Sequence, residues 1–427
     1  MKNGRLNTRV RTGLVAALDV GTTKVCCLIA RADGERGPDG VQKPRIVGIG
    51  HQVSSGMRKG AVVNLDLAES SIRAVVEAAE QMAGENIDRV IVNLGGGRHR
   101  SRLIAYEISI AGHEIGDADI RRVLDPANMD GEKTEDREFI HTIPVGYTVD
   151  GTRGVIDPRG LFGERLGVNT HIISALRGPL RNLETAVSRC HLAVEDIVVS
   201  PYASALGCLS DDEKKMGVTC IDMGGGTTSV AVFFDGELVH AQVLPLGGEH
   251  VTNDISRGLV TPLIHAERMK TLYGNALPSV SDDEQVIQVP LMGEDPMDEG
   301  SAVPRSMLVS IVRPRVEEIF EQLRDRLAQC GFDKVAGRGL VLTGGASQLG
   351  GVAELASRLL DKQVRLGRPL AMNGMPEAAA GPTFATCRGL LHYGLGHGAK
   401  EADIDDCAGA QPRGRMGRIG QWLRENF

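Results

Sequence analysis

Two stretches of the chain, residues 15–29 and 218–234, share one pattern of apolar and polar positions. Each reads as an apolar run, a tight turn that begins Asp-x-Gly and contains a Thr-Thr pair, and a second apolar run. Apolar runs of this length on both sides of a tight turn predict a β-hairpin rather than a helix. The second copy carries two additional glycines. Because the copies lie about 200 residues apart, they indicate two related halves and not a short-period repeat protein.

A third apolar run, residues 339–343, enters a glycine turn at Gly344 and Gly345. A helical pattern then follows, with apolar residues at Leu349, Val352, Leu355, Leu359 and Leu360. The N-terminus of a helix behind such a turn lets a ligand approach the backbone closely. The turn is neither G-x-G-x-x-G nor a Walker A loop, because the chain contains no Gly-Lys-Ser or Gly-Lys-Thr.

Residues 261–274 carry the signals of one well-bounded helix. Thr261 is predicted as the N-cap, Pro262 as the first helical residue and Gly274 as the residue just beyond the end. Glu267 and Lys270 lie three residues apart and share a face of this helix. On its own such a pair would be read as a surface ion pair, which is common and contributes little to stability.

The two Asp-x-Gly-Thr turns have the composition of phosphate and metal sites. Glycine lets backbone N–H groups approach phosphate oxygens closely, and threonine hydroxyls add donors. An aspartate at a strand end can hold Mg²⁺, which keeps several waters and takes one or two carboxylates. One such turn alone would be read as an ordinary hairpin turn, since short motifs often match by chance. Two copies with matching flanks favour phosphate binding.

The composition is that of a soluble globular protein with room for several substructures. The chain has 427 residues, of which 42% are hydrophobic and 24% charged, against roughly 100–200 residues for a usual domain. Aromatic residues make up only 3%, and the net charge is −7. Few aromatics argue against base-stacking surfaces and the acidic balance argues against wrapping a duplex, so no nucleic-acid partner is expected.

Neither the cysteines nor the apolar runs point to zinc, secretion or a membrane span. The eight cysteines form no C-x-x-C pair and no cluster with zinc spacing, which favours buried free thiols in a reducing compartment. No stretch reaches the ~18 consecutive apolar residues of a spanning helix. The basic start imitates a signal peptide, but its apolar run ends at Asp19 after five residues, short of the ~7–15 required. We expect the chain to stay inside the cell.

Taken in this order, the two hairpins, the Thr-Gly-Gly-Ala turn and the helix with Glu267 and Lys270 resemble the actin/Hsp70/sugar-kinase superfamily. In that superfamily the nucleotide lies in a cleft between two ribonuclease-H-like halves. Longer segments narrow the resemblance to the FtsA family of bacterial cell-division proteins, over essentially the whole chain. These segments are residues 56–64, 141–150 and 156–166. The ending, residues 419–427, is similar to the membrane-targeting helix of that family.

The resemblance implies an α/β, actin-like fold of two lobes with an inserted α+β subdomain (1C, SHS2-like) and a C-terminal amphipathic helix. Apolar strands at residues 90–94 and 101–110 and a helix near Asp117 support an inserted block. The expected divisions are 12–83, 172–216 and 375–398 for the first lobe (1A), 84–171 for the insertion, 217–257 and 338–374 for the second lobe (2A), 258–337 for its small subdomain (2B), 399–412 for a flexible linker and 413–427 for the terminal helix.

The resemblance also assigns a site for ATP and Mg²⁺. The phosphates would be held by residues of the two hairpins: Gly21, Thr22, Thr23, Lys24, Gly224, Gly225, Gly226, Thr227 and Thr228. Asp19 and Asp222 would face Mg²⁺ through water. The adenosine would contact the glycine turn at Gly344, Gly345 and Ala346, with Glu267 and Lys270 on ribose and base, and Gly247 and Gly248 would close the phosphate pocket.

One position departs from the superfamily pattern. Relatives of the Hsp70 and cell-shape actin type carry Glu-Pro on the crossing segment, where the glutamate helps position the attacking water, and this chain has Ser200-Pro201. Serine cannot accept a proton near neutral pH without a base beside it. We therefore expect tight ATP binding and at most weak ATPase activity, with no catalytic residue assigned.

The C-terminal tail predicts a membrane-surface helix. Its apolar stripe is Met416, Ile419, Trp422, Leu423 and Phe427, and its basic residues include Arg415, Arg418 and Arg424. A short basic helix with an aromatic on its apolar face suits the bilayer interface, on an anionic membrane surface. The same pattern would also fit a helix that docks on its own core or in a partner's groove.

The resemblance implies an ATP-binding cell-division scaffold that polymerises and tethers the FtsZ ring to the cytoplasmic face of the inner membrane at the division site. The implied partners are the C-terminal peptide of FtsZ on the small subdomain, other copies of the chain, and later division proteins. Arg305, Arg313 and Arg315 are the exposed-looking candidates for acidic groups of the FtsZ peptide.

Other functions within the superfamily stay open. A small-molecule kinase needs an aspartate near the γ-phosphate to accept the substrate's proton, and the tempting candidate, Asp157, lies in the inserted block. A pilus-assembly type of actin-like ATPase shares the insertion but is not expected to carry the terminal helix. An Hsp70-like chaperone would need a substrate-binding domain after the nucleotide domain.

Overall fold

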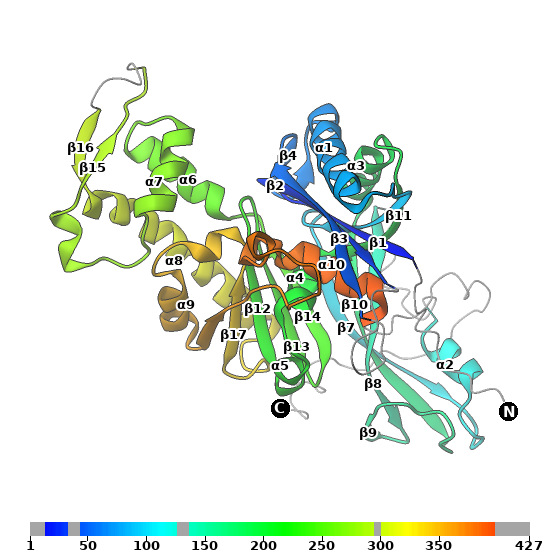
Figure 1. Ribbon diagram of the computed structural model, residues 1–427. Helices are drawn as coiled ribbons and strands as arrows, with labels where there is room; N and C mark the ends of the chain where they lie inside the picture. The colour runs from blue at the N-terminus through cyan, green and yellow to red at the C-terminus, as the bar shows by residue number, and fades with distance from the viewer. Residues whose placement is uncertain (1–12, 33–42, 126–135, 294–299, 398–427) are drawn as a thin grey trace.

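The computed structural model describes residues 13–32, 43–125, 136–293 and 300–397. Two five-stranded sheets lie side by side and form the centres of two lobes (Figure 1). The predicted linker 399–412 and the predicted terminal helix 413–427 lie outside the described residues. Within the described ranges, no helix combines the length and apolar character that crossing a membrane requires.

The first sheet has the spatial order β11-β6-β1-β2-β3. Its strands are β1 Leu14–Val20, β2 Lys24–Arg31, β3 Arg45–Val53, β6 Arg89–Leu94 and β11 Ala193–Val199. The first two form the predicted antiparallel hairpin, and their residues are buried on both faces. A sheet covered on both faces reads as continuous apolar runs rather than as alternation, which is why the two runs are so uniformly hydrophobic.

The second sheet repeats the first, with the order β14-β13-β12-β17-β18. Its strands are β12 Val218–Met223, β13 Thr228–Phe234, β14 Glu237–Leu244, β17 Gly339–Thr343 and β18 Gln363–Leu366. In both sheets an antiparallel three-stranded meander continues into two parallel strands. The prediction of two related halves, each opening on an Asp-x-Gly-Thr hairpin, is therefore confirmed.

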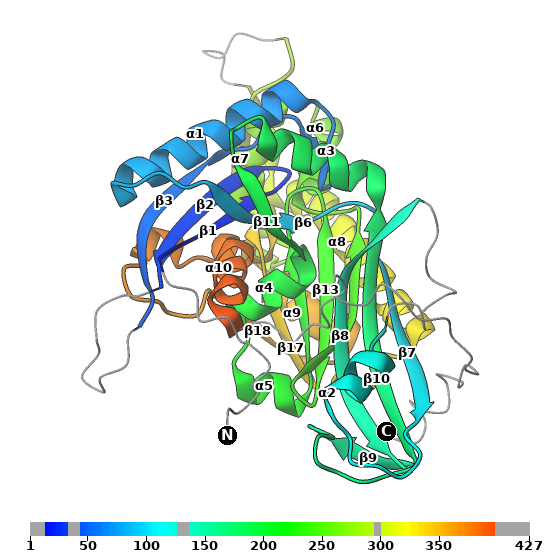
Figure 2. The same cartoon turned by 90° about the vertical axis from the view of Figure 1, so that its right-hand side faces the viewer.

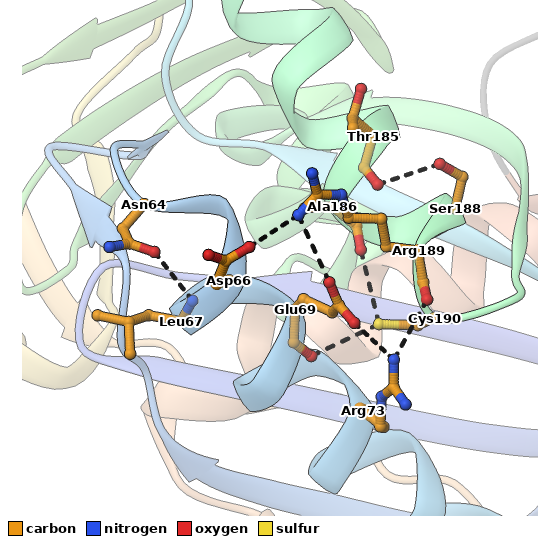
Figure 3. A network of polar contacts seen from close by, with 10 residues as sticks. All are labelled: Asn64, Asp66, Leu67, Glu69, Arg73, Thr185, Ala186, Ser188, Arg189 and Cys190. Carbon is orange, nitrogen blue, oxygen red and sulfur yellow. Dashed lines mark hydrogen bonds and ion pairs between the residues drawn. The ribbon is translucent and has the colours of Figure 1, made fainter.

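Helices α1 Leu65–Ala83 and α3 Arg177–Ser188 pack together beside the first sheet (Figure 1). Polar contacts join them (Figure 3). The Arg189 guanidinium lies 2.9 Å from Asp66 and 3.6 Å from Glu69, and the Arg73 guanidinium lies 2.5 Å from Glu69. The half-buried Cys190 thiol donates to the backbone carbonyls of Glu69 and Ala186.

Between the two sheets lie α4 Ser200–Cys208 and α10 Ala385–His392, which cross each other at glycines. A β-carbon on Gly389 would stand 1.6 Å from the carbonyl oxygen of Ala203, and one on Gly207 would stand 2.0 Å from that of Ala385. Only glycine permits this approach of the two backbones. The apolar core around the crossing is continuous and takes residues from both sheets, including Ala17 and Val218.

A third, antiparallel sheet extends away from the lobes (Figure 2). Its order is β7-β10-β8-β9, and its strands are β7 Arg100–Ser109, β8 Arg137–Val149, β9 Thr152–Val155 and β10 Arg165–Leu176. With α2 Asp117–Val123 it encloses a small core of its own. The prediction that the strand at 90–94 belongs to this block was wrong, because β6 pairs with β1 and β11 of the first sheet.

Buried histidines join this third sheet to both lobes. The Ser101 hydroxyl lies 2.7 Å from Nε2 of His171 and 3.3 Å from Nδ1 of His240, and it accepts the Ala241 N–H at 3.1 Å. On the other side Nε2 of His141 accepts the N–H of Val199, the residue before α4, at 3.1 Å. The inserted sheet is thus hydrogen-bonded to the second lobe and to the start of a crossing helix.

The small subdomain of the second lobe is built on a long helix (Figure 1). Its elements are α6 Gly248–Gly258, α7 Leu263–Tyr273, η2 Val280–Asp283, β15 Val286–Val289, β16 Ser301–Pro304 and α8 Arg305–Cys330. The prediction of Thr261 as an N-cap was wrong. Pro262 occupies the cap position of α7, and the Thr261 hydroxyl donates instead to the carbonyl of Pro290 at 2.5 Å.

The remaining elements are short. They are β4 Met57–Arg58, β5 Ala61–Val62, α5 Asp211–Met216, η3 Gly345–Gln348, α9 Val352–Leu360, η4 Glu377–Ala379, η5 Pro382–Phe384 and η6 Tyr393–His397. The turn at Gly344 therefore leads first into a single 3₁₀ turn, and the expected α-helix begins only at Val352.

Substituting alanine for Gly389 is expected to lower the free energy of unfolding by about 1–3 kcal/mol or more, because the added methyl group overpacks the helix crossing. The matched control is Gly178→Ala in α3, where a β-carbon meets nothing within 4 Å and alanine should stabilise the helix slightly. Urea unfolding followed by circular dichroism measures both. Equal midpoints for the two variants would contradict the crossing contact.

Stability should fall as the pH drops below about 6.5. Burial lowers the pKa of His99 and of His171 to about 3 and that of His240 to about 4. The unfolded chain takes up these protons near pH 6.5 and the folded chain does not, so each histidine removes roughly 1.4 kcal/mol per pH unit from there down to its folded pKa. Burial raises the pKa of Asp19 to about 6, which offsets part of this loss.

Urea unfolding of the wild type and of His171→Asn at pH 7.5 and 5.5 isolates one histidine. The variant should lose less stability than the wild type between the two pH values, whatever its stability at pH 7.5. The same pH dependence in both proteins would show that the buried imidazole is not the cause.

Candidate functional site

The turns of the two repeated hairpins meet face to face between the lobes. A β-carbon on Gly225 would lie 2.3 Å from Cγ2 of Thr23, and one on Gly226 would lie 2.5 Å from Oγ1 of Thr22. Within each turn a glycine N–H donates across the hairpin, from Gly21 to the Lys24 carbonyl and from Gly224 to the Thr227 carbonyl, both at 2.9 Å. The structure thus brings the two predicted loops into van der Waals contact through their glycines and threonines.

The two aspartates stand at the strand ends that lead into these turns. Asp19 is 6% exposed, and its pKa is raised to about 6, mainly by burial, with the neighbouring Lys24 acting against the rise and Asp222 adding to it. Burial also raises the pKa of Asp222, while hydrogen bonds from the Ser204 and Thr386 hydroxyls act in the opposite direction. A cation beside these desolvated carboxylates would stabilise their charged forms.

This donor set fits a hydrated Mg²⁺ rather than a metal held wholly by protein. Magnesium keeps several waters and needs only one or two carboxylates. In the part of the chain that the structure describes, no group of three or more His, Cys, Asp or Glu side chains could hold a metal ion.

Lys24 is already engaged within the first lobe. Its ammonium donates to the backbone carbonyl of Thr383 and lies 3.9 Å from the centroid of the Phe384 ring. A cation over an aromatic face gains electrostatic stabilisation from the ring. The expected contact of Lys24 with phosphate stays a prediction. In the structure its ammonium group contacts residues of η5.

The predicted closing residues pack against the second hairpin. The N–H of Gly248 donates to the carbonyl of Gly224 at 2.9 Å, and that of Glu249 donates to the carbonyl of Gly225 at 2.8 Å. A β-carbon on Gly247 would lie 2.5 Å from the Gly224 oxygen. The first N–H groups of α6 therefore hold the hairpin turn in place.

The Glu267 and Lys270 pair forms as predicted and reaches the same region. The Lys270 ammonium lies 2.6 Å from Glu267, 2.9 Å from the Thr252 hydroxyl and 3.2 Å from the Gly248 carbonyl. The Thr252 hydroxyl in turn donates to the Glu267 carboxylate at 2.5 Å. The pair is thus tied to the first turn of α6.

The glycine turn of the second lobe completes the arrangement. Gly344 has φ +86°, in the left-handed region, and a β-carbon there would lie 2.2 Å from Oδ1 of Asp222. A β-carbon on Gly248 would stand 3.0 Å from that of Ala346, and one on Gly345 would stand 3.1 Å from the methyl group of Thr383. The hairpins, the glycine turn and the Glu267 helix converge on one region between the lobes.

Ser200 occupies the first turn of α4, where its hydroxyl accepts a hydrogen bond from the Asn93 side-chain amide at 3.1 Å. An amide is not a base near neutral pH. Asp157, the aspartate considered for a kinase, lies on the connection between β9 and β10 of the inserted sheet and pairs with Arg159.

Sequence reasoning missed the residues that support the hairpins. The Thr22 hydroxyl accepts the N–H of Gly60 at 3.0 Å, from a segment used above only for its family resemblance. Ser204 and Thr386 donate to Asp222 from helices that are far apart in the chain. No local pattern identifies Thr386, whereas Ser204 lies four residues after Ser200, the position where relatives carry the glutamate.

The expectation of three exposed arginines is wrong for Arg305, and the other two are partly exposed and engaged in ion pairs. Arg305 binds the buried Asp282 carboxylate at 2.8 Å and the Tyr273 carbonyl, and its side chain is 17% exposed. Arg315 pairs with Asp254 at 2.5 Å and with Glu318. Arg313 lies 2.7 Å from Glu317 and is 43% exposed. The tail residues proposed for the membrane, from Met416 to Phe427, lie outside the described residues.

Solved structures with the same fold are actin-like. A PilM–PilN type IV pilus biogenesis complex superposes with a TM-score of 0.62 at 17% identity, covering 89% of this chain and 98% of that one. MreB 5 of Spiroplasma citri bound to AMPPNP superposes with a TM-score of 0.52 at 12% identity, covering 90% of this chain and 96% of that one. A MamK double helical filament gives a TM-score of 0.50 at 13% identity, with 90% and 98% covered. The fold is therefore actin-like.

Family models and relatives identify the chain more closely. A model described as "Cell division protein FtsA" matches residues 219–389, and one described as "SHS2 domain inserted in FTSA" matches residues 96–174. The chain is 44% identical to the cell division protein FtsA of Rhizobium meliloti (strain 1021), covering 98% of this chain and 96% of the relative. It is 34% identical to that of Escherichia coli (strain K12), with 97% and 98% covered. The chain belongs to the FtsA family of cell division proteins.

Proposed function

We propose that the chain is an ATP-binding division scaffold that assembles with its own copies and attaches the FtsZ ring to the membrane. The observation that carries the nucleotide part is the contact between the two Gly-Thr hairpin turns, each next to a desolvated aspartate. Backbone N–H groups of glycine turns and threonine hydroxyls suit phosphate oxygens.

A bound Mg²⁺ would neutralise phosphate charge, and Asp19 and Asp222 would hold it through water. The cost of burying these two carboxylates, seen in their raised pKa values, would be offset by the cation. Gly344, Gly345 and Ala346 would contact the adenosine, and Glu267 with Lys270 would reach the ribose and base. Their contacts with one another and with α6 keep these groups at one end of the proposed site.

Hydrolysis is proposed to be slow. The Ser200 hydroxyl accepts a hydrogen bond from the Asn93 side-chain amide, which is not a base, so Ser200 would not deprotonate an attacking water. A nucleotide that stays bound would act as a structural ligand that stabilises one arrangement of the lobes, as any ligand that binds only the native state does.

Self-assembly is proposed from family membership and fold. One solved structure of this fold is a double helical filament of MamK. We propose that later division proteins contact the inserted sheet, and that the FtsZ C-terminal peptide docks on the small subdomain. Of the three arginines considered for that peptide, Arg313 is the most exposed, and its ion pair with Glu317 is a surface pair that a competing carboxylate could displace.

Membrane attachment is proposed from the tail sequence. Each arginine near anionic lipid contributes ~1 kcal/mol, so the basic residues of one tail supply about 3–4 kcal/mol before the apolar stripe inserts. Binding of that strength is reversible. An assembly that carries many tails would bind far more tightly, because later contacts become intramolecular.

The wild type is expected to release heat on titration with ATP and Mg²⁺, and Gly226→Val should weaken binding at least about tenfold, or ~1.4 kcal/mol. The added side chain would enter the space of Thr22 and separate the two turns. Gly146→Ala, in the inserted sheet where a β-carbon meets nothing within 4 Å, is the matched control and should bind as the wild type does.

The absence of any heat of association between the wild type and adenine nucleotides would contradict the nucleotide proposal. A turnover well above about one per minute, toward the ~1 s⁻¹ lower end of ordinary enzymes, would contradict only the proposal of slow hydrolysis.

Exchanging Trp422 and Leu423 together for glutamate is expected to abolish co-sedimentation with liposomes that contain anionic lipid, because the substitutions put charge into the apolar stripe. The control is Ala408→Glu with Ala410→Glu, which adds the same charge within the expected linker and should leave co-sedimentation largely intact. If both double variants sediment like the wild type, the tail is not the anchor.

A further inference from the structure

Two hydroxyl groups from the crossing helices meet on one carboxylate of the second sheet. The Ser204 hydroxyl on α4 lies 2.5 Å from Oδ2 of Asp222, and the Thr386 hydroxyl on α10 lies 3.2 Å from the same oxygen. The two hydroxyl oxygens are 2.9 Å apart. Ser204 is fully buried and Thr386 is 8% exposed, so water does not compete freely for these contacts.

The protons available in this cluster define its hydrogen bonds. Each hydroxyl carries one proton, and the carboxylate only accepts when it is ionised. Ser204, at the shorter distance, donates to Asp222, and Thr386 donates either to the same oxygen or to Ser204. Both arrangements direct a proton of Ser204 at Oδ2 and leave the lone pairs of Oδ1 to face the glycine turn at Gly344.

These contacts join elements that belong to different parts of the molecule. Asp222 is the penultimate residue of β12 in the second sheet, and α4 packs against that sheet. Thr386 is on α10, which packs against β1 and β2 of the first sheet. The contact between Thr386 and Asp222 is thus a hydrogen bond between the lobes, next to the backbone contact at Gly207 and Gly389.

We propose that Ser204 and Thr386 are positioning residues for the metal and nucleotide site, which orient the Asp222 carboxylate for a hydrated cation. Because the two hydroxyls come from both crossing helices, the cation site and the packing of the lobes share one hydrogen-bonded cluster. The inference rests on the proposed nucleotide function. A hydrogen bond to a charged group contributes more than one between neutral groups, so removing either hydroxyl should affect the cation strongly.

Calorimetric titration of the full chain with ATP, in excess Mg²⁺ and in EDTA, tests the inference. The Mg²⁺ gain is the ratio of the ATP affinity in Mg²⁺ to the ATP affinity in EDTA. Ser204→Ala and Thr386→Val should each lower this gain about tenfold, while the affinity in EDTA stays within about twofold of the wild type. Thr386→Ser and Ser204→Thr, which keep a hydroxyl, should recover most of the gain.

The matched control is Thr219→Val on the same strand as Asp222. Thr219 is fully buried, and its hydroxyl has no hydrogen-bond partner among the described residues, so its loss should leave the Mg²⁺ dependence unchanged. Thermal unfolding of each variant is measured without nucleotide, to show that the variant is folded. Thr386→Val keeps the side-chain shape, and if Ser204→Ala does not fold, Thr386→Val decides alone.

The outcomes separate this inference from the proposed function. If the wild type binds no ATP in either condition, the proposed function fails and the inference fails with it. If the wild type binds with Mg²⁺ and the variants keep its full Mg²⁺ gain, or lose affinity equally in Mg²⁺ and EDTA, only the inference is overturned. A loss confined to Mg²⁺ that the hydroxyl-retaining variants recover supports it.

Discussion

The contact of two helix backbones at Gly207 and Gly389 sets the distance between the lobes. A β-carbon on Gly207 would stand 2.0 Å and one on Gly389 1.6 Å from the opposing carbonyl oxygen, so no side chain larger than hydrogen fits on either side. The two sheets therefore share one apolar core at the crossing. The hairpin turns at the ends of β1 and β12 are brought together as a consequence, since each is a rigid extension of its sheet.

This closeness has an electrostatic consequence. Two aspartates at equivalent strand ends are carried into a poorly solvated region, and burial raises the pKa of both. The protein offsets this in different ways in the two halves. At Asp19 the charge of Lys24 acts against the rise in pKa. At Asp222 hydrogen bonds from the Ser204 and Thr386 hydroxyls act against it first, and the charge of Lys24 adds to their effect. The two copies of the motif thus share one backbone hairpin, but different side chains act on the aspartate of each copy.

Local pattern predicted the repeated hairpins and the strand Gly339–Thr343, because these runs are apolar, uninterrupted and bounded by glycine turns. It failed where the outcome depends on a distant partner. The sequence of the strand Arg89–Leu94 would suit the first lobe and the inserted subdomain equally well, and only its pairing with β1 places it in the first sheet. Arg305 reads as a surface cation until the buried Asp282 is known. The two donors on Asp222 are 182 residues apart, so no window of sequence contains both.

The position of the inserted sheet is fixed by hydrogen bonds to a strand of each lobe. His141 on β8 accepts the N–H of Val199 immediately before α4, and Ser101 on β7 accepts the N–H of Ala241 on β14 of the second sheet. A sheet attached at both places cannot turn relative to one lobe without breaking a buried hydrogen bond to the other, and a buried unpaired donor costs about 1–3 kcal/mol. The imidazoles of His171 and His240 share the Ser101 hydroxyl and strengthen the attachment to the second lobe. The inserted sheet is therefore held at Val199, the residue that links β11 to the helix carrying Ser204, and at Ala241 of the second sheet, so the surface it presents depends on how the two lobes pack.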